Sequence, residues 1–231
     1  MEKAINYRHL KILALIAMTV DHIGAILMTG EESLRIIGRV SFPIFLFMII
    51  NSAKHTSDYM AFMKRLLIFS AASMIPYYLA FHSFYNVGFI YAITIAFTAG
   101  IDSLLIQYRM EERICTGTLA MTVILPFFML ADKEMFRFCW YAIGMALIIY
   151  YRESLGITVC IILSTALAYT YGLFDLSNNV SVIISLPVYW FLFAYDKQMA
   201  YKKQTPFQKY FYYIYYPAHL LFLVAIKGVI V

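Results

Sequence analysis

Three titratable side chains lie within apolar segments of the sequence, where an ionisable group is costly unless it is paired or serves a function. Asp21 and His22 interrupt the first apolar segment, and His219 follows Pro217 in the last one. If both segments cross a membrane, the three groups lie at nearly the same depth, close to its midplane. The sequence therefore predicts one buried site shared by both ends of the chain, with imidazoles able to accept, donate or relay protons.

Helix geometry separates the roles of the two adjacent groups. Neighbouring residues of an α-helix point about 100° apart, so Asp21 cannot orient His22 directly. We expect Asp21 to pair with Arg39 or Arg35 of the second segment, which are the nearest basic groups by depth. His22 is then free to face an internal cavity.

A stripe of residues leads from the inner surface to His22. Lys11 precedes His22 by close to three helical turns, so the two residues share one face and differ by about 16 Å in depth. A phosphorylated carrier with an extended arm, such as coenzyme A, fits that length. In a simpler interpretation, Arg8 and Lys11 are topology anchors and His22 is a hydrogen-bonded structural residue. Spacing alone leaves both open.

Two further groups of residues have a structural and a functional interpretation. Tyr212, Tyr216 and His219 share one helical face, which is either an aromatic packing face beside a proline or part of the site. A second group lies at the inner end of the second segment and is either a topology anchor or a phosphate-binding collar. Its members are Asn51, His55, Lys64 and Arg65.

The composition indicates the elements that carry these groups. Of the 231 residues, 63% are hydrophobic and 13% are charged, whereas soluble domains have about 45–50% and 25%. The apolar segments lack the alternation of a β-barrel, so their backbone groups must be satisfied within helices. The sequence predicts an all-α integral membrane protein.

About nine transmembrane helices follow from the apolar segments, in a single domain that comprises residues 1–231. Thirteen of the Lys and Arg residues then lie in inner loops and five outside, which puts the N-terminus in the cytoplasm and the C-terminus outside. The predicted spans are 9–30, 35–52, 63–82, 87–107, 114–131, 135–151, 155–172, 179–195 and 210–230.

Several functions are excluded by the patterns. The net charge of +5 reflects basic clusters between apolar runs, so we expect no nucleic-acid partner. Cys115, Cys139 and Cys160 are too widely spaced for a zinc site or a disulfide framework, and we expect no metal. Phosphate-binding loops, dinucleotide-binding glycine motifs and zinc-protease helices are missing from the sequence.

Three blocks of motif carry a resemblance to a known family. They are Asp21-His22, Arg-x-x-x-Arg-x-x-Phe-Pro beginning at Arg35, and Tyr-Pro-x-His beginning at Tyr216. With the intervening motifs, the chain resembles, from end to end, the TraX family of membrane proteins, which includes the F-pilin N-acetylase. The intervening motifs are Asn51, His55-Thr56, Arg65-Leu66-Leu67, Ser73-x-x-Pro76 and Phe97-Thr98.

The resemblance implies a transmembrane acyltransferase of the bacterial cell membrane. Such proteins move an acyl group, typically acetyl from cytoplasmic acetyl-CoA, to an acceptor at the membrane or its outer face. The acceptor is an amine or hydroxyl of a peptide, a glycan or a lipid. The chain would contact membrane lipid throughout.

Roles for the candidate residues follow as a hypothesis. Lys11 and Arg65 would bind the phosphates of coenzyme A, and His22 would act as general base or carry the acyl group. Asp21 with Arg39 or Arg35 would form an electrostatic frame. The remaining candidates, His219 and Tyr216, would hydrogen-bond the thioester oxyanion.

Two other functions stay open on the sequence alone. In a proton-coupled transporter or flippase, Asp21, His22 and His219 would relay protons across the membrane. In a structural component of a conjugation or secretion assembly, His22 would be dispensable once the protein has inserted.

Overall fold

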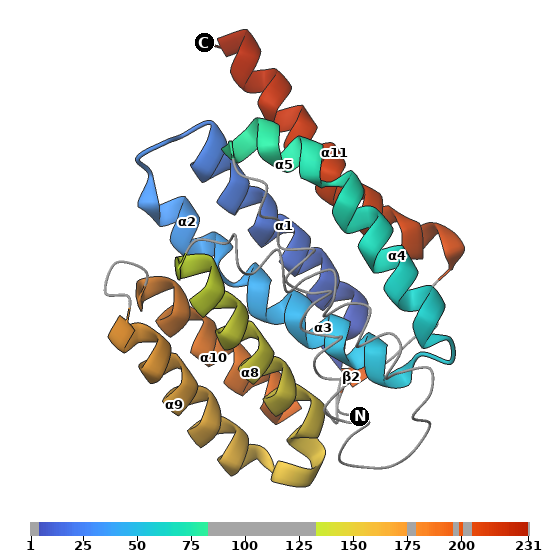
Figure 1. Cartoon of the computed structure of the whole chain (residues 1–231), viewed down its shortest axis with the longest axis vertical. Coiled ribbons are helices and arrows are strands. Elements are labelled where there is room, and N and C mark those ends of the chain that lie inside the picture. The colour runs from blue at the N-terminus through green and yellow to red at the C-terminus, as the bar shows by residue number, and fades with distance from the viewer. Residues whose placement is uncertain (1–4, 83–132, 175–178, 196–198, 201–204, 231) are drawn as a thin grey trace. The chain divides into compact units, whose positions relative to one another are not determined.

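The computed structural model describes residues 5–82, 133–174, 179–195, 199–200 and 205–230, and these are helical except for two short strands and the connecting turns (Figure 1). The predicted spans 87–107 and 114–131 lie outside the described residues. The elements are β1 (Ile5–Asn6), α1 (Tyr7–Ile26), α2 (Glu32–Gly38), α3 (Ser41–His55), α4 (Tyr59–Ala72), α5 (Met74–Phe81), α8 (Lys133–Leu155), α9 (Ile157–Phe174), α10 (Asn179–Tyr195), β2 (Met199–Ala200) and α11 (Pro206–Ile230).

The chain divides into two compact units. Unit 1 comprises Met1–Phe45, Ile68–Asn86 and Val180–Val231, and therefore joins the two ends of the sequence. Unit 2 comprises Leu46–Leu67 and Val87–Asn179. All residues that the sequence nominates for catalysis belong to unit 1.

Every predicted span within the described residues coincides with a helix or with two successive helices. Span 35–52 is divided into α2 and α3, and span 63–82 into α4 and α5. Pro43 and Pro76 lie at the third position of the second helix of each pair, where each lacks the N–H that would continue the preceding helix. Proline therefore accounts for both interruptions.

Two helices of the described chain are long and apolar enough to cross a membrane. They are Tyr7–Ile26 and the continuous stretch Glu32–His55. Shorter apolar helices occur at Ile157–Thr170 and Ile184–Tyr195. The crossing of a membrane by all nine predicted spans remains a prediction.

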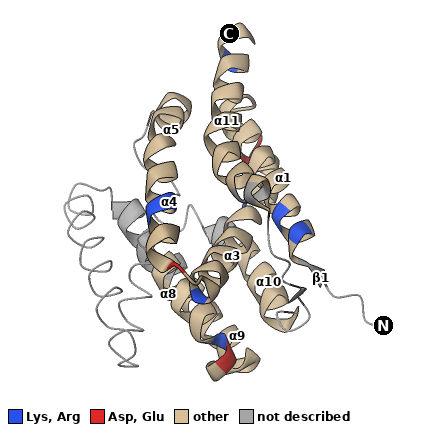
Figure 2. Ribbon diagram, turned by 90° about the vertical axis from the view of Figure 1, so that its right-hand side faces the viewer, with Lys and Arg blue, Asp and Glu red and all other residues tan. Residues whose placement is uncertain are grey.

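The first helix buries two ionisable side chains among apolar ones and leaves several large apolar side chains exposed. Lys11 and His22 are 8% and 7% exposed, whereas Leu13 and Ile16 are 51% and 57% exposed. Figure 2 shows that charged residues are sparse along α1, α5 and α11, and that the basic residues of α1 lie towards β1. The exposed large apolar side chains and the scarcity of charge suit a hydrocarbon solvent.

The first and last helices pack in parallel within unit 1. Contacts between them advance together along both helices, from Lys11 with Tyr212 to His22 with His219. The strands that precede these helices are also parallel, with Ile5 opposite Met199. Helix α5 also packs against α11. This arrangement brings residues almost two hundred positions apart into one layer.

Glycines permit the close approach of α1 to α2. Gly30 in the connecting turn has φ 117°, in the left-handed region that favours glycine. A Cβ on Gly24 would lie 2.8 Å from the Cβ of Leu34, and a Cβ on Gly38 would overlap the Asp21 side chain and lie 2.6 Å from its Cα. Because these two glycines have no side chain, α1 and α2 can pack closely enough for Asp21 to lie against α2.

We predict that Gly38→Ala lowers the thermal stability of the detergent-solubilised protein, because the added methyl group must displace the α1 backbone at Asp21. Overpacking of this kind costs about 1–3 kcal/mol. The measurement is the unfolding midpoint by fluorescence or circular dichroism. Gly228→Ala is the matched control, since a Cβ there meets no atom within 4 Å. Equal midpoints for both variants would contradict the tight packing.

Candidate functional site

The imidazoles of His22 and His219 are in direct contact. His22 Nδ1 lies 2.6 Å from His219 Nε2, and the two rings stack with their centroids 4.9 Å apart and their planes 12° apart. The rings come from α1 and α11 and are 7% and 8% exposed. The structure therefore brings these two histidines, from opposite ends of the chain, into one buried contact. We name this contact the histidine pair.

Aromatic and aliphatic side chains enclose the histidine pair. Phe81 of α5 and Tyr216 of α11 lie with their ring centroids 5.5 Å and 6.2 Å from that of His22. An apolar cluster that includes Ile26, Leu220 and Leu223 packs one helical turn further along α1 and α11. The burial of both rings strengthens the electrostatic interactions of the pair.

Asp21 pairs with the second segment, as the helix geometry predicted. Arg35 Nη1 lies 3.5 Å from Asp21 Oδ2, with the side chains 33% and 14% exposed. Arg39 acts electrostatically on the same carboxylate. The other oxygen, Oδ1, is buried and has no hydrogen-bond partner among the described residues. Asp21 thus anchors α2 beside the histidine pair without contacting the His22 ring.

Lys11 lies buried between two tyrosine rings rather than free in solvent. Its Nζ is 4.7 Å from the ring centroid of Tyr212 and 5.3 Å from that of Tyr7. Cation–π contacts of a desolvated ammonium contribute about 2 kcal/mol. None of the ion pairs among the described residues includes Lys11. The cation on the His22 face of α1 is therefore held by ring faces and keeps its hydrogen-bond donors.

Sequence reasoning missed two residues that contact the site. Tyr215 stacks on His219 with ring centroids 5.1 Å apart, and its carbonyl lies 2.8 Å from His219 Nδ1. The hydroxyl of Tyr215 lies 2.7 Å from Thr19 Oγ1 on α1. The available signal was spacing, because Tyr215 precedes His219 by one helical turn and Thr19 precedes His22 by three residues.

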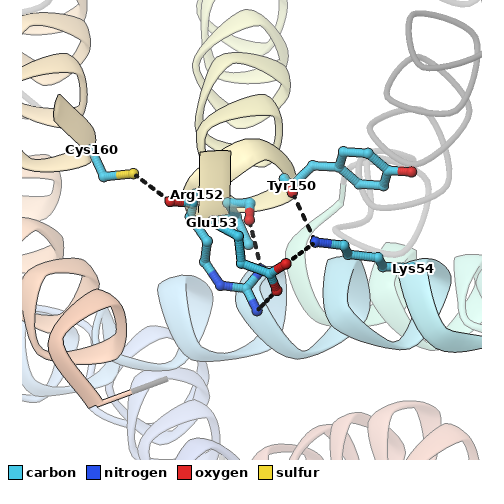
Figure 3. Close-up of polar contacts among 6 residues, drawn as sticks. Lys54, Tyr150, Arg152, Glu153 and Cys160 are labelled. Carbon is cyan, nitrogen blue, oxygen red and sulfur yellow. Dashed lines mark hydrogen bonds and ion pairs between the residues drawn. The ribbon is translucent and has the colours of Figure 1, made fainter. Parts of the chain in front are cut away.

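A second polar group, in unit 2, consists of Lys54, Tyr150, Arg152 and Glu153 (Figure 3). Lys54 Nζ lies 3.2 Å from Glu153 Oε2 and donates to the carbonyl of Tyr150 at 3.4 Å. Arg152 is buried, donates to the carbonyl of Ile149 at 2.7 Å and lies over the Phe47 ring. These cations thus bind near the carboxyl end of α8.

This arrangement favours a topology anchor, rather than a phosphate-binding site, at the inner end of α3. Lys54 and His55 occupy the last turn of α3, where the negative end of the helix dipole attracts cations. The carboxyl end of α8 adds a second negative end, and such ends repel an anion. Asn51 is buried one turn earlier on α3, and Arg65 lies on α4 in unit 2. The role of Arg65 in donor binding stays a prediction.

A metal site does not emerge from the part of the chain that the structure describes. No group of three or more His, Cys, Asp or Glu side chains there is arranged to hold an ion. The histidine pair has a basic group, Lys11, along α1 and the Asp21–Arg35 ion pair beside it.

The fold and the site define a helical protein with two membrane-length helices and a buried pair of histidines that joins the first helix to the last. The sequence model of one protein family, described as TraX protein, matches residues 6–227. The chain belongs to the TraX family. Neither the curated proteins nor the solved structures contain a match to this chain.

We predict that Glu153→Gln lowers stability slightly at neutral pH, by under about 1 kcal/mol, since exposed ion pairs contribute little. The hydrogen bond and charge of Lys54 hold the pKa of Glu153 below its ordinary value of 4.5. A carboxyl group whose pKa is lowered on folding stabilises the folded state. That stabilisation is fully present when the pH is above the ordinary pKa, and it is lost as the pH falls through the lowered pKa.

The measurement is the difference in unfolding midpoint between the wild type and Glu153→Gln as a function of pH. Glu31→Gln serves as the control, because the described chain gives Glu31 no ion pair. A difference that persists unchanged into strong acid would contradict the proposed ion pair.

Proposed function

We propose that this protein is a multi-pass membrane acyltransferase that moves an acetyl group from cytoplasmic acetyl-CoA to an amine or hydroxyl acceptor. The observation that carries the proposal is the 2.6 Å contact between His22 and His219, both of which are buried. A buried imidazole with a hydrogen-bonded partner is suited to general-base catalysis. Membership of the TraX family supports the same chemistry through its F-pilin acetylase branch.

The reaction needs one group that moves a single proton twice. His22 takes the proton of the acceptor while the acceptor's lone pair forms a bond to the thioester carbonyl carbon. The carbon–sulfur bond then breaks, and His22 returns the proton to the leaving thiolate. The products are the acetylated acceptor and free coenzyme A, and His22 is restored.

The other side chains have supporting roles in this proposal. Lys11 keeps its donors for a phosphate of coenzyme A, about three helical turns from His22, and Arg65 remains a second candidate. Tyr216 lies edge-on to both imidazoles and is the candidate donor to the thioester oxyanion. His219 engages both ring nitrogens, with His22 and the Tyr215 carbonyl, which makes it a positioning residue rather than an oxyanion donor.

The ion pair beside the histidine pair contributes fixed charges. Arg35 and Arg39 lie close to Asp21 on α1, directly next to His22. Their positive charges favour the negative charge that develops on the thioester oxygen as the acceptor attacks. Burial makes this stabilisation stronger than it would be in water.

Topology is consistent with a donor and an acceptor on opposite sides. In this proposal both α1 and α11 cross the membrane. Because the two helices pack in parallel, they cross in the same direction, and the proposed chain crosses an odd number of times. With the excess of basic residues in the inner loops, this supports a cytoplasmic N-terminus and a C-terminus outside.

We expect His22→Ala to abolish acetylation of the acceptor, and His219→Ala to reduce it by about 10²–10⁴-fold, the usual contribution of general acid–base catalysis. The assay compares the intact mass of peptides, glycans and lipids from cells with each variant, and looks for a lost acetyl group. His9→Ala is the control, because His9 lies on the exposed side of α1.

The same variants separate this function from its alternatives. Full acetylation with inserted His22→Ala protein would refute a catalytic imidazole. Retained biological function in that variant would support a structural component. Loss of pH-driven substrate flux in liposomes, with no thioester consumed by the wild type, would support a transporter.

We also expect opposite locations for the two termini. Alkaline phosphatase, which is active only outside the cytoplasm, should be active when fused after Val231 and inactive when fused before Met1. Activity of both fusions, or of neither, would indicate an even number of crossings and would contradict the parallel pairing of α1 and α11.

A further inference from the structure

We infer that Tyr215 is a positioning residue that determines which nitrogen of His22 carries a proton, so that Nε2 of His22 is the nitrogen that reacts. The statement that His22 Nε2 reacts rests on the proposed function. The position of the proton on His22 follows from hydrogen bonds alone. Tyr215 lies outside the residues nominated by the sequence and acts through both its carbonyl and its hydroxyl.

The carbonyl of Tyr215 determines the proton on His219. A carbonyl oxygen only accepts hydrogen bonds. His219 Nδ1, 2.8 Å from this oxygen, must therefore be the protonated nitrogen. In a neutral imidazole only one nitrogen carries hydrogen, so His219 Nε2 has a free lone pair and acts as an acceptor.

The proton on His22 follows from the same argument. His219 Nε2, as an acceptor, needs a donor 2.6 Å away, and the atom at that position is His22 Nδ1. Neutral His22 therefore carries its proton on Nδ1 and leaves Nε2 with a free lone pair. When Nε2 takes a proton, the resulting cation keeps its hydrogen bond to His219, which stabilises the charge.

The alternative arrangement requires a buried cation at rest. His219 would have to hold protons on both nitrogens, so that Nε2 donates to His22. The ion pairs of the described residues include neither histidine, while Arg35 and Arg39 are positive groups that act on His22. A buried cation without a partner is strongly disfavoured, so the neutral pair is the resting state.

The hydroxyl of Tyr215 joins α11 to α1 at the height of the pair. Thr19 Oγ1 donates its only hydrogen to the carbonyl of Leu15 at 2.8 Å. The hydroxyl of Tyr215, 2.7 Å from Thr19 Oγ1, must therefore be the donor of the second bond. This hydrogen bond, in which the Tyr215 hydroxyl donates to Thr19 Oγ1, holds the two helices in register three residues from His22.

The direct test is ¹⁵N NMR of the full-length protein in detergent with labelled histidine. The five histidines are assigned by the single substitutions His9→Gln, His55→Gln, His82→Gln, His22→Gln and His219→Gln. We expect protonated, pyrrole-type Nδ1 and unprotonated, pyridine-type Nε2 in both His22 and His219 at neutral pH. A pyrrole-type Nε2 on His22 would overturn the inference, whether or not the protein transfers acetyl groups.

The role of the Tyr215 hydroxyl is tested by kinetics. Tyr215→Phe and Thr19→Val should each lower kcat about tenfold, the loss of roughly one hydrogen bond at the transition state, with the KM for acetyl-CoA unchanged. The double variant should be no slower than either single one, because both remove the same bond. Thr19→Ser, which keeps the hydroxyl, should restore the rate.

Two control variants remove a comparable group elsewhere. Thr165→Val deletes a hydroxyl that makes the same bond to the carbonyl four residues earlier, at 2.7 Å, on an exposed face. Tyr210→Phe removes a hydroxyl from an exposed ring of α11. Additive losses in the double variant, or equal losses in the controls, would overturn the positioning role while leaving the acyltransferase function intact.

Discussion

The hydrogen bond between His22 and His219 links the two ends of the sequence at a depth where a polar group has few partners. Each imidazole satisfies the other, and the carbonyl of Tyr215 satisfies the remaining nitrogen of His219. The parallel packing of α1 on α11 places the two rings in contact, and Phe81, Tyr215 and Tyr216 pack against them. Separation of the helices would expose two polar rings to an apolar environment.

The charged side chains near the histidine pair each have a partner. Lys11 is held by tyrosine faces, Asp21 by Arg35, and the close packing of Gly38 keeps that ion pair beside the imidazoles. Each buried charge has a distinct kind of partner. The histidine pair therefore lies beside fixed charges on the neighbouring helix, and the proposed acyl transfer would use those charges to stabilise a developing oxyanion.

Unit 2 shows how similar residue types serve structure instead. Lys54 and Arg152 donate to carbonyls near the carboxyl end of α8, and Glu153 balances their charge at the surface. Basic residues at helix carboxyl ends need no ligand to explain them. Lys11 differs from these residues, because its donors are not taken by carbonyls or carboxylates among the described residues and its contacts are with ring faces.

Within the described residues, the sequence by itself determined the helices, their approximate ends and the burial of His22 and His219, because apolar segments and ionisable residues within them are local features of composition. It also determined that Asp21 and His22 have separate roles, since that follows from helical geometry. Only the tertiary structure decided that Arg35 is the ion-pair partner, that Tyr215 and Thr19 belong to the site, and which nitrogens of the histidine pair carry protons. Those outcomes depend on the rotation and register of α1 against α11, which are decided by packing across almost the whole length of the chain, and no local pattern encodes them.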